Sequence, residues 1–203
     1  MMKCVCAFSR RADVRREDCQ AYYEGQHAPL AARHFPFAGY VRNHLIDAPD
    51  IGFDTISEFW ADDLERLTAP LGGPVGEIMA QDEARFMDRA RTNPAQSEEF
   101  VLGRDRSNGG RCLRWAALLD WPKAFDGRAR QAILAWATPI ATEAGAISLD
   151  LLRMESGPAF PARAILWLSD AKGLPPPPAG VALTAIRVRR FVTPKSALGR
   201  WRL

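Results

Sequence analysis

The sequence has few of the residues that build metal, redox or covalent catalytic sites. Of its 203 residues, only three are histidine and four are cysteine. It has no CxxC pair, no HExxH motif and no paired histidine spacing, so we expect no metal site and no disulfide framework. The cysteines are expected to be buried free thiols that behave as small hydrophobic side chains, with a nucleophilic or redox thiol as the alternative.

Long apolar runs and phosphate-binding loops are also missing. No apolar run approaches the ~18 residues of a membrane helix, and the first apolar stretch stops at Phe8, too short for a signal peptide. We therefore expect a cytoplasmic protein with no membrane partner. The glycines of 71–74 lack the Lys-Ser/Thr of a P-loop, and no GxSxG motif occurs, which excludes P-loop nucleotide binding and argues against a serine hydrolase.

What is present is an ordinary globular composition, 47% hydrophobic and 25% charged, with an uneven charge distribution. Residues 1–106 carry a net charge of −5 and residues 107–203 a net charge of +8. The basic half has no nucleic-acid-reading motif, so we expect no nucleic-acid partner. An acidic and a basic half attract each other instead, within one chain or between two chains in a homodimer of the whole chain.

The two halves repeat one pattern. Each begins with a basic residue, a cysteine and an apolar strand, at 3–8 and at 111–116. In both halves a proline near the end of the helix, an Ala-Gly step and a third strand follow in the same order. Corresponding residues of the two halves are 106 to 110 positions apart. Five matches in one order predict a tandem duplication, with domains 1–106 and 107–203.

Apolar periodicity predicts the elements of each half. In the first half we expect strands at 2–9, 38–47, 53–61 and 98–104, and helices at 15–32, 62–72 and 74–91. The second half has the same order, but Pro175 to Pro178 replace its second helix with an extended link before a last strand at 182–192. The best linking segments are Asn93 to Glu98 and Arg106 to Gly110.

Strand–helix–strand–strand–helix–strand is the ferredoxin-like order. Its antiparallel sheet has helices on one face only, so the other apolar face needs a cover. The sequence therefore predicts an α+β fold, in which two ferredoxin-like halves fused in tandem pack sheet to sheet within one chain. A cavity is expected between the two sheets.

The first half resembles the EthD family of dimeric α/β-barrel proteins over about residues 2–105. The residues that carry the resemblance are Tyr22 to Leu30, Gly39 to His44, Asp54 to Trp60 with Asp62 and Asp63, and Asp82 to Phe86. The second half resembles the family in outline only, as a degenerate copy. The resemblance implies a pocket for a small hydrophobic molecule, often aromatic or polyketide-like. Relatives in the superfamily include cofactor-free oxygenases, cyclases, dehydratases and haem enzymes, so the fold does not settle the reaction.

The three histidines, His27, His34 and His44, all lie in the first half. By alignment, the second half has Ala137 near His27 and Asp150 near His44, so we expect one site per chain. His27 is our candidate for proton transfer, since the ordinary pKa of histidine, ~6.5, lies near working pH. The alternative is that the histidines are structural.

Further candidates flank His27 in the predicted fold. Tyr23 lies one turn before it. Glu58 on the third strand would act as an acid or base with a raised pKa if it faced the cavity, and would only pair with a base if it faced the other side. Asn43 and His44 must face opposite sides of their strand, whereas Tyr40, Arg42 and His44 share one side. The predicted catalytic residues are therefore His27, His44, Glu58 and Tyr23, and the predicted substrate-binding residues are Tyr40, Arg42, Asn43 and Trp60.

These observations favour a cofactor-independent enzyme, a lyase, dehydratase or oxygenase, that acts on a small hydrophobic aromatic or polyketide-type molecule. Two alternatives stay open at this point. One is a binding or accessory protein without chemistry of its own, and the other is a haem-dependent relative that binds haem through one histidine.

Overall fold

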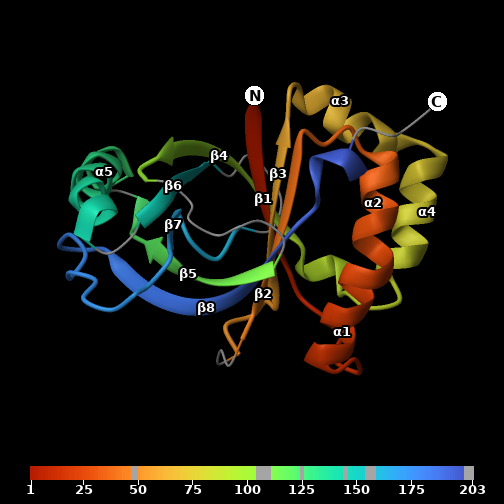
Figure 1. Ribbon diagram of the computed structural model, residues 1–203, viewed down its shortest axis with the longest axis horizontal. Coiled ribbons are helices and arrows are strands. Elements are labelled where there is room, and N and C mark those ends of the chain that lie inside the picture. Colours follow the sequence, from red (N-terminus) through yellow and green to blue (C-terminus); the bar gives the residue numbers. More distant parts are fainter. Residues whose placement is uncertain (47–49, 104–110, 124–125, 144–145, 154–158, 199–203) are drawn as a thin grey trace.

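Eight strands close into one barrel in the computed structural model of the chain, which describes residues 1–46, 50–103, 111–123, 126–143, 146–153 and 159–198 (Figure 1). The strands are β1 (Met2–Phe8), β2 (Gly39–Leu45), β3 (Thr55–Ala61), β4 (Asn93–Val101), β5 (Arg111–Asp120), β6 (Ala146–Arg153), β7 (Ala164–Leu168) and β8 (Ala182–Val192). Around the barrel they follow the order β1-β3-β2-β8-β5-β7-β6-β4, and every neighbouring pair is antiparallel.

Each half of the chain supplies four adjacent strands. In the first half the order is β4-β1-β3-β2, and in the second it is β6-β7-β5-β8. The halves meet along two seams, where β2 pairs with β8 and β4 pairs with β6. The sheets therefore do not merely face each other but share backbone hydrogen bonds, which leaves no free sheet edge in the barrel.

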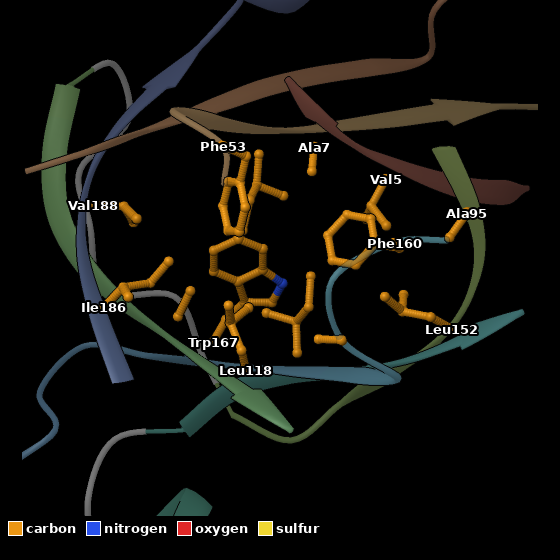
Figure 2. Packing of buried hydrophobic residues seen from close by; sticks show 14 of the residues in the cluster. Val5, Ala7, Phe53, Ala95, Leu118, Leu152, Phe160, Trp167, Ile186 and Val188 are labelled. Atoms are coloured by element: carbon orange, nitrogen blue, oxygen red, sulfur yellow. The ribbon is translucent and has the colours of Figure 1, made fainter. Parts of the chain in front are cut away.

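Side chains that alternate along the strands fill the barrel interior (Figure 2). A strand presents successive side chains to opposite faces, so Val5 and Ala7 of β1 point inward while Cys4, Cys6 and Phe8 point outward. Trp167, Phe53 and Phe160 occupy the centre of this packing. The predicted cavity between the sheets is therefore wrong: large side chains fill that space, as the close packing of protein interiors requires.

Helices cover the outer face of each half on opposite sides of the barrel (Figure 1). On the first half these are α1 (Arg16–Tyr22), the π-helix η1 (Tyr23–His27), α2 (Ala28–His34), α3 (Leu64–Thr68), the 3-10 helix η2 (Ala69–Gly72) and α4 (Pro74–Glu83). They pack on the sheet through Cys19, Tyr23, Ala31 and Met79. Helix α5 (Asp126–Glu143) covers the second half and packs through Ile133, Ala137 and Ile140.

Some predicted boundaries differ from the structure. Strand β4 begins at Asn93, so the segment from Asn93 to Glu98 is strand and not a link. Pro94 concealed this start, since proline removes a backbone donor, but a proline is tolerated near the beginning of a strand. Helix α4 ends at Glu83, well before the predicted residue 91, and a short 3-10 helix, η3 (Arg89–Arg91), follows.

The segment between β7 and β8 was predicted to be an extended link in place of a helix. Residues 169–181 contain turns and extended chain but no helix. The predicted link from Arg106 to Gly110 and the second Ala-Gly step, at 144–145, lie outside the described residues. None of the helices within the described ranges is long and apolar enough to cross a membrane.

Candidate functional site

The predicted site residues fall on two sides of the first-half sheet. Tyr23, His27, Tyr40, Arg42 and His44 lie between the sheet and its helices. The remaining three belong to the barrel side: Asn43 and Glu58 are buried inside it, and Trp60 is half-buried at its rim. The opposite orientation of Asn43 and His44 follows from strand alternation. The structure therefore does not bring Glu58 to His27.

A single π-helical turn places Tyr23 and His27 on the buried side of their helix. The N–H of Ala28 bonds to the carbonyl of Tyr23, five residues back instead of the usual four. The cause is Pro29, which has no N–H and whose ring clashes with the carbonyl four residues before it, at Gly25. The chain accommodates this by widening one turn, a feature that is frequent at functional sites. As a result His27 is buried, whereas Gln26, the residue before it, is exposed.

His27 forms a buried pair with Asp82. Its Nδ1 lies 2.7 Å from Oδ2 of Asp82, which is on α4, and both side chains are nearly inaccessible to solvent. Burial lowers the pKa of His27 below its ordinary value, outweighing the attraction of Asp82, which raises it. His27 is therefore neutral at neutral pH. With Nδ1–H donated to the carboxylate, Nε2 is left as the basic nitrogen.

Next to this pair lies an apolar cavity of about 250 Å³, which we call the His27 cavity. It is outside the barrel, between the first-half sheet and helices α2, α3 and α4. The ionisable side chains on its wall are His27, Glu83, Tyr40, Cys4 and Cys6. Burial raises the pKa of Glu83. The rest of the wall is mostly apolar, including Phe8, Phe35, Phe37, Phe59, Leu64, Leu67, Leu71 and Met79.

Tyr23 lies between the two histidines of the site. Its ring meets His27 edge-on at a centroid distance of 4.7 Å and His44 at 5.5 Å. Its hydroxyl lies 2.9 Å from Oγ of Ser57 and accepts a hydrogen bond from the Tyr40 hydroxyl at 3.1 Å. Burial raises the pKa of Tyr23 well above its ordinary value, so this residue stays protonated and carries no charge.

His44 belongs to a separate ionic group behind Tyr23. Its Nε2 lies 2.7 Å from Oε1 of Glu24, and Arg42 binds the same carboxylate at 2.5 Å. Burial lowers the pKa of His44 more than Glu24 raises it. His44 and Arg42 are not on the wall of the His27 cavity, so their position supports packing of η1 on the sheet and not contact with a ligand there.

Inside the barrel, Glu58 belongs to a buried ionic network that joins the two halves. Lys3 reaches Oε2 of Glu58 and Oδ2 of Asp150 at 2.8 Å each, and Arg114 contacts both Glu58 and Asn43. Burial alone raises the pKa of Glu58, but Arg114 and Lys3 outweigh burial and lower it to about 2. The condition for an acid or base role, a raised pKa, is therefore not met: Glu58 pairs with basic residues and remains a carboxylate.

The strand registers also correct the alignment of the two halves. Val5 pairs with Glu58, and Ala116 pairs with Trp167, at equivalent places in the two sheets. By the same registers Lys3 corresponds to Arg114, and Asn43 to Asp150. Asp150 is thus the counterpart of Asn43 and not of His44. The sequence alignment placed this strand one residue out of register, because an apolar pattern alone does not fix the offset between two strands.

Sequence reasoning did not single out Asp82, Lys3 or Arg114. Asp82 was visible only as part of the segment that resembles the EthD family, with no sign that it would meet His27. Lys3 was visible as the basic residue that begins the first half, and Arg114 as a charge within the strand at 111–116. A charge on a predicted strand gives no indication that it faces a closed interior.

The described residues contain no cluster of three ligands for a metal ion. A haem could in principle bind Nε2 of His27, but a cavity of about 250 Å³ is below the ~300–1,000 Å³ of sites for drug-sized ligands and is too small for a porphyrin. The residues present therefore do not fit a haem at this position.

The fold is mixed α+β with a closed eight-stranded barrel. Residues 11–90 match the family model of the EthD domain, which confirms the resemblance of the first half to that family. A search of curated proteins gives no match.

Solved structures of other proteins share the fold. A monooxygenase-like protein from Lactobacillus acidophilus NCFM superposes with a TM-score of 0.54 at 11% identity, and the match covers 96% of each chain. An anthrone oxidase-like protein superposes with a TM-score of 0.62 at 10% identity, over 95% of this chain and 91% of that chain. At such identities the likeness concerns the fold alone.

Proposed function

We propose that the chain is a cofactor-free enzyme of the oxygenase type that acts on a small apolar aromatic molecule in the His27 cavity. One observation carries the proposal: a neutral histidine, fixed by a buried aspartate at 2.7 Å, lies on the wall of an apolar cavity. A base in a water-poor site is suited to removing a weakly acidic proton. The monooxygenase-like and oxidase-like proteins of the same fold agree with this chemistry.

The cavity limits the size of the substrate. A hydrocarbon cavity of ~150 Å³ holds benzene. The His27 cavity, at about 250 Å³, takes a molecule of one or two rings, and a third ring would extend beyond it into solvent. Because the wall is apolar except at a few points, the substrate is uncharged and carries its hydroxyl or carbonyl group toward His27.

In the proposed reaction, Nε2 of His27 takes a proton from a phenol or from a C–H group activated by a ring carbonyl. The resulting anion gives one electron to O₂, the co-substrate, and the substrate radical and superoxide combine into a peroxide. His27 then returns its proton to the peroxide, and loss of water leaves a new carbonyl group. Asp82 stabilises the protonated imidazole between these two transfers.

We also infer that the second half is a degenerate ferredoxin-like copy of the first. The identical strand order of the halves supports this inference, as does the matching of Lys3 with Arg114 across the barrel. On the second half, Ile133 and Ala137 of α5 belong to the same buried apolar cluster as Leu149 and Leu166, so the space between helix and sheet is packed there. This agrees with one site per chain.

The test combines ligand binding with oxygen consumption. Binding of 1-naphthol is measured by fluorescence, and oxygen uptake is followed with 1-naphthol and with anthrone, which has three rings. His27→Ala should keep naphthol binding and lose uptake, whereas Ala31→Phe, which fills the cavity from α2, should lose both. Binding without uptake in the unmodified protein would instead favour a lyase or a non-catalytic binding protein.

A further inference from the structure

The carboxylate of Asp82 has a second partner that comes from the same helical segment as His27. The hydroxyl of Tyr22 donates to Oδ1 of Asp82 at 2.8 Å, while His27 engages Oδ2 at 2.7 Å. Tyr22 is the last residue of α1 and His27 the last of η1, so one widened turn separates them. Asp82, on α4, is thus held at both oxygens by two side chains that the helix presents together.

The direction of the Tyr22 hydrogen bond follows from the chemistry of its partner. An ionised carboxylate can only accept, so the Tyr22 hydroxyl gives its proton to Asp82. The Tyr22 ring is held by Phe86, at a centroid distance of 5.1 Å, so the hydroxyl is presented from a packed ring.

We propose that Tyr22 is a positioning residue for the catalytic base: it fixes the rotation of the Asp82 carboxylate and thereby keeps the proton of His27 on Nδ1 and the lone pair on Nε2. Without the Tyr22 hydrogen bond, Asp82 can turn, and His27 can adopt the other tautomer, in which Nε2 carries the proton. That tautomer has no basic nitrogen at the cavity. This proposal rests on the proposed function for its catalytic meaning, but the tautomer itself can be measured without a substrate.

The experiment is nitrogen NMR of the ¹⁵N-labelled full chain, which reports which ring nitrogen carries the proton. Three histidines are present, and His27 is assigned from the signals that His27→Gln removes. In the unmodified protein we expect the proton on Nδ1. In Tyr22→Phe, which keeps the ring packing, we expect the ratio of the two tautomers to change by about tenfold, the size of one hydrogen bond to a charged group.

A second pair of variants separates positioning from packing. In Asp82→Asn, the Tyr22 hydroxyl should donate to the amide carbonyl, so the NH₂ group faces His27. The NH₂ group then donates to Nδ1, and the ring proton of His27 moves to Nε2. In the double variant Tyr22→Phe/Asp82→Asn the amide is free to turn back, so part of the Nδ1 tautomer should return. Loss of packing alone cannot produce such a recovery. Thr138→Val, which removes a distant exposed hydroxyl on α5, is the control and should leave His27 unchanged.

Each outcome bears on the proposal. A changed tautomer ratio in Tyr22→Phe together with recovery in the double variant supports it. An unchanged ratio in Tyr22→Phe, or a proton on Nε2 in the unmodified protein, overturns it. If the tautomers follow the prediction but no aromatic compound causes oxygen uptake, the positioning role stands and the proposed oxygenase function fails.

Discussion

At the scale of single residues, His27 and His34 form a natural pair for testing the site. Both lie on the helical segment between β1 and β2, but His27 is buried against Asp82, while His34 is half-exposed at the end of α2. His27→Ala should lower the rate of oxygen uptake about 10²–10⁴-fold, the usual contribution of a proton-transfer group. His34→Ala should have little effect. Equal, small losses in both would make His27 a structural residue.

The dependence of the rate on pH follows from the lowered pKa of His27. The base is active only when neutral, so the rate should rise with pH through a pKa below the ordinary ~6.5 of histidine and stay level above it. Measured kcat/KM against pH, which reports the pKa values of the free enzyme, should show this acidic limb. A limb above pH ~7 would contradict the lowered pKa and indicate another base.

The lowered pKa values of the buried histidines also predict how the stability of the protein depends on pH. Since the pKa values of His27 and His44 are both lowered by folding, the unfolded chain binds protons that the folded chain does not. The free energy of unfolding should therefore be constant above pH ~7 and fall as the pH drops through ~6.5. Urea unfolding at several pH values checks this. In His27→Ala the dependence should be weaker.

How far the sequence could predict the site is clear from these residues. His27 and Tyr23 were accessible because they are close in the chain and four residues apart, so helix geometry alone brings them together. Asp82 is 55 residues away from His27, and nothing local determines that the two meet. Strand alternation separated Asn43 from His44, but only the closure of the barrel determines that Glu58 faces its interior.

At the scale of elements, the widened turn η1 is the feature that places the site. Its physical cause is Pro29, so replacing this residue should restore regular hydrogen bonding. We expect Pro29→Ala to preserve or raise the melting temperature, because alanine is the better helix former, and to lower oxygen uptake by turning His27 away from Asp82. Circular dichroism melting and the NMR tautomer measurement test both parts. A variant with unchanged His27 would show that the turn has another cause.

The elements themselves were largely accessible to sequence reasoning. The last strand was predicted at 182–192 and lies there, because alternating residues and flanking turns mark it at both ends. Strand β4 was misplaced because Pro94 and polar residues at its start resemble a loop. The shape of α3, η2 and α4 depends on their packing over the His27 cavity, which no local pattern encodes.

At the scale of the whole molecule, the barrel makes the two halves dependent on each other. Lys3 bridges Glu58 of its own half and Asp150 of the other half. Lys3→Met should lower the free energy of unfolding by about 3–5 kcal/mol, since it removes a cation that contacts the buried carboxylates of both Glu58 and Asp150. Chemical denaturation should give one transition in both proteins. Two separate transitions would show that the halves fold independently.

Removal of the second half tests the same dependence directly. A fragment of residues 1–106 would expose the barrel-facing side of β1 to β4, with Val5, Ile56 and Leu45 in contact with water. We expect it to aggregate or to pair with a second copy of itself, as measured by light scattering. A soluble monomeric fragment would contradict the role of the second half as the cover of this face.

Because both seams lie within one polypeptide, dilution of the protein does not separate the two sheets. A barrel assembled from two separate chains obeys mass action and comes apart when its concentration falls below the dissociation constant. Here β2 meets β8 and β4 meets β6 at an effective concentration set by the covalent connection, of the order of millimolar for short flexible links. Its assembly is thus independent of how much protein a cell makes, and the His27 cavity keeps its supporting sheet even at a few copies per cell.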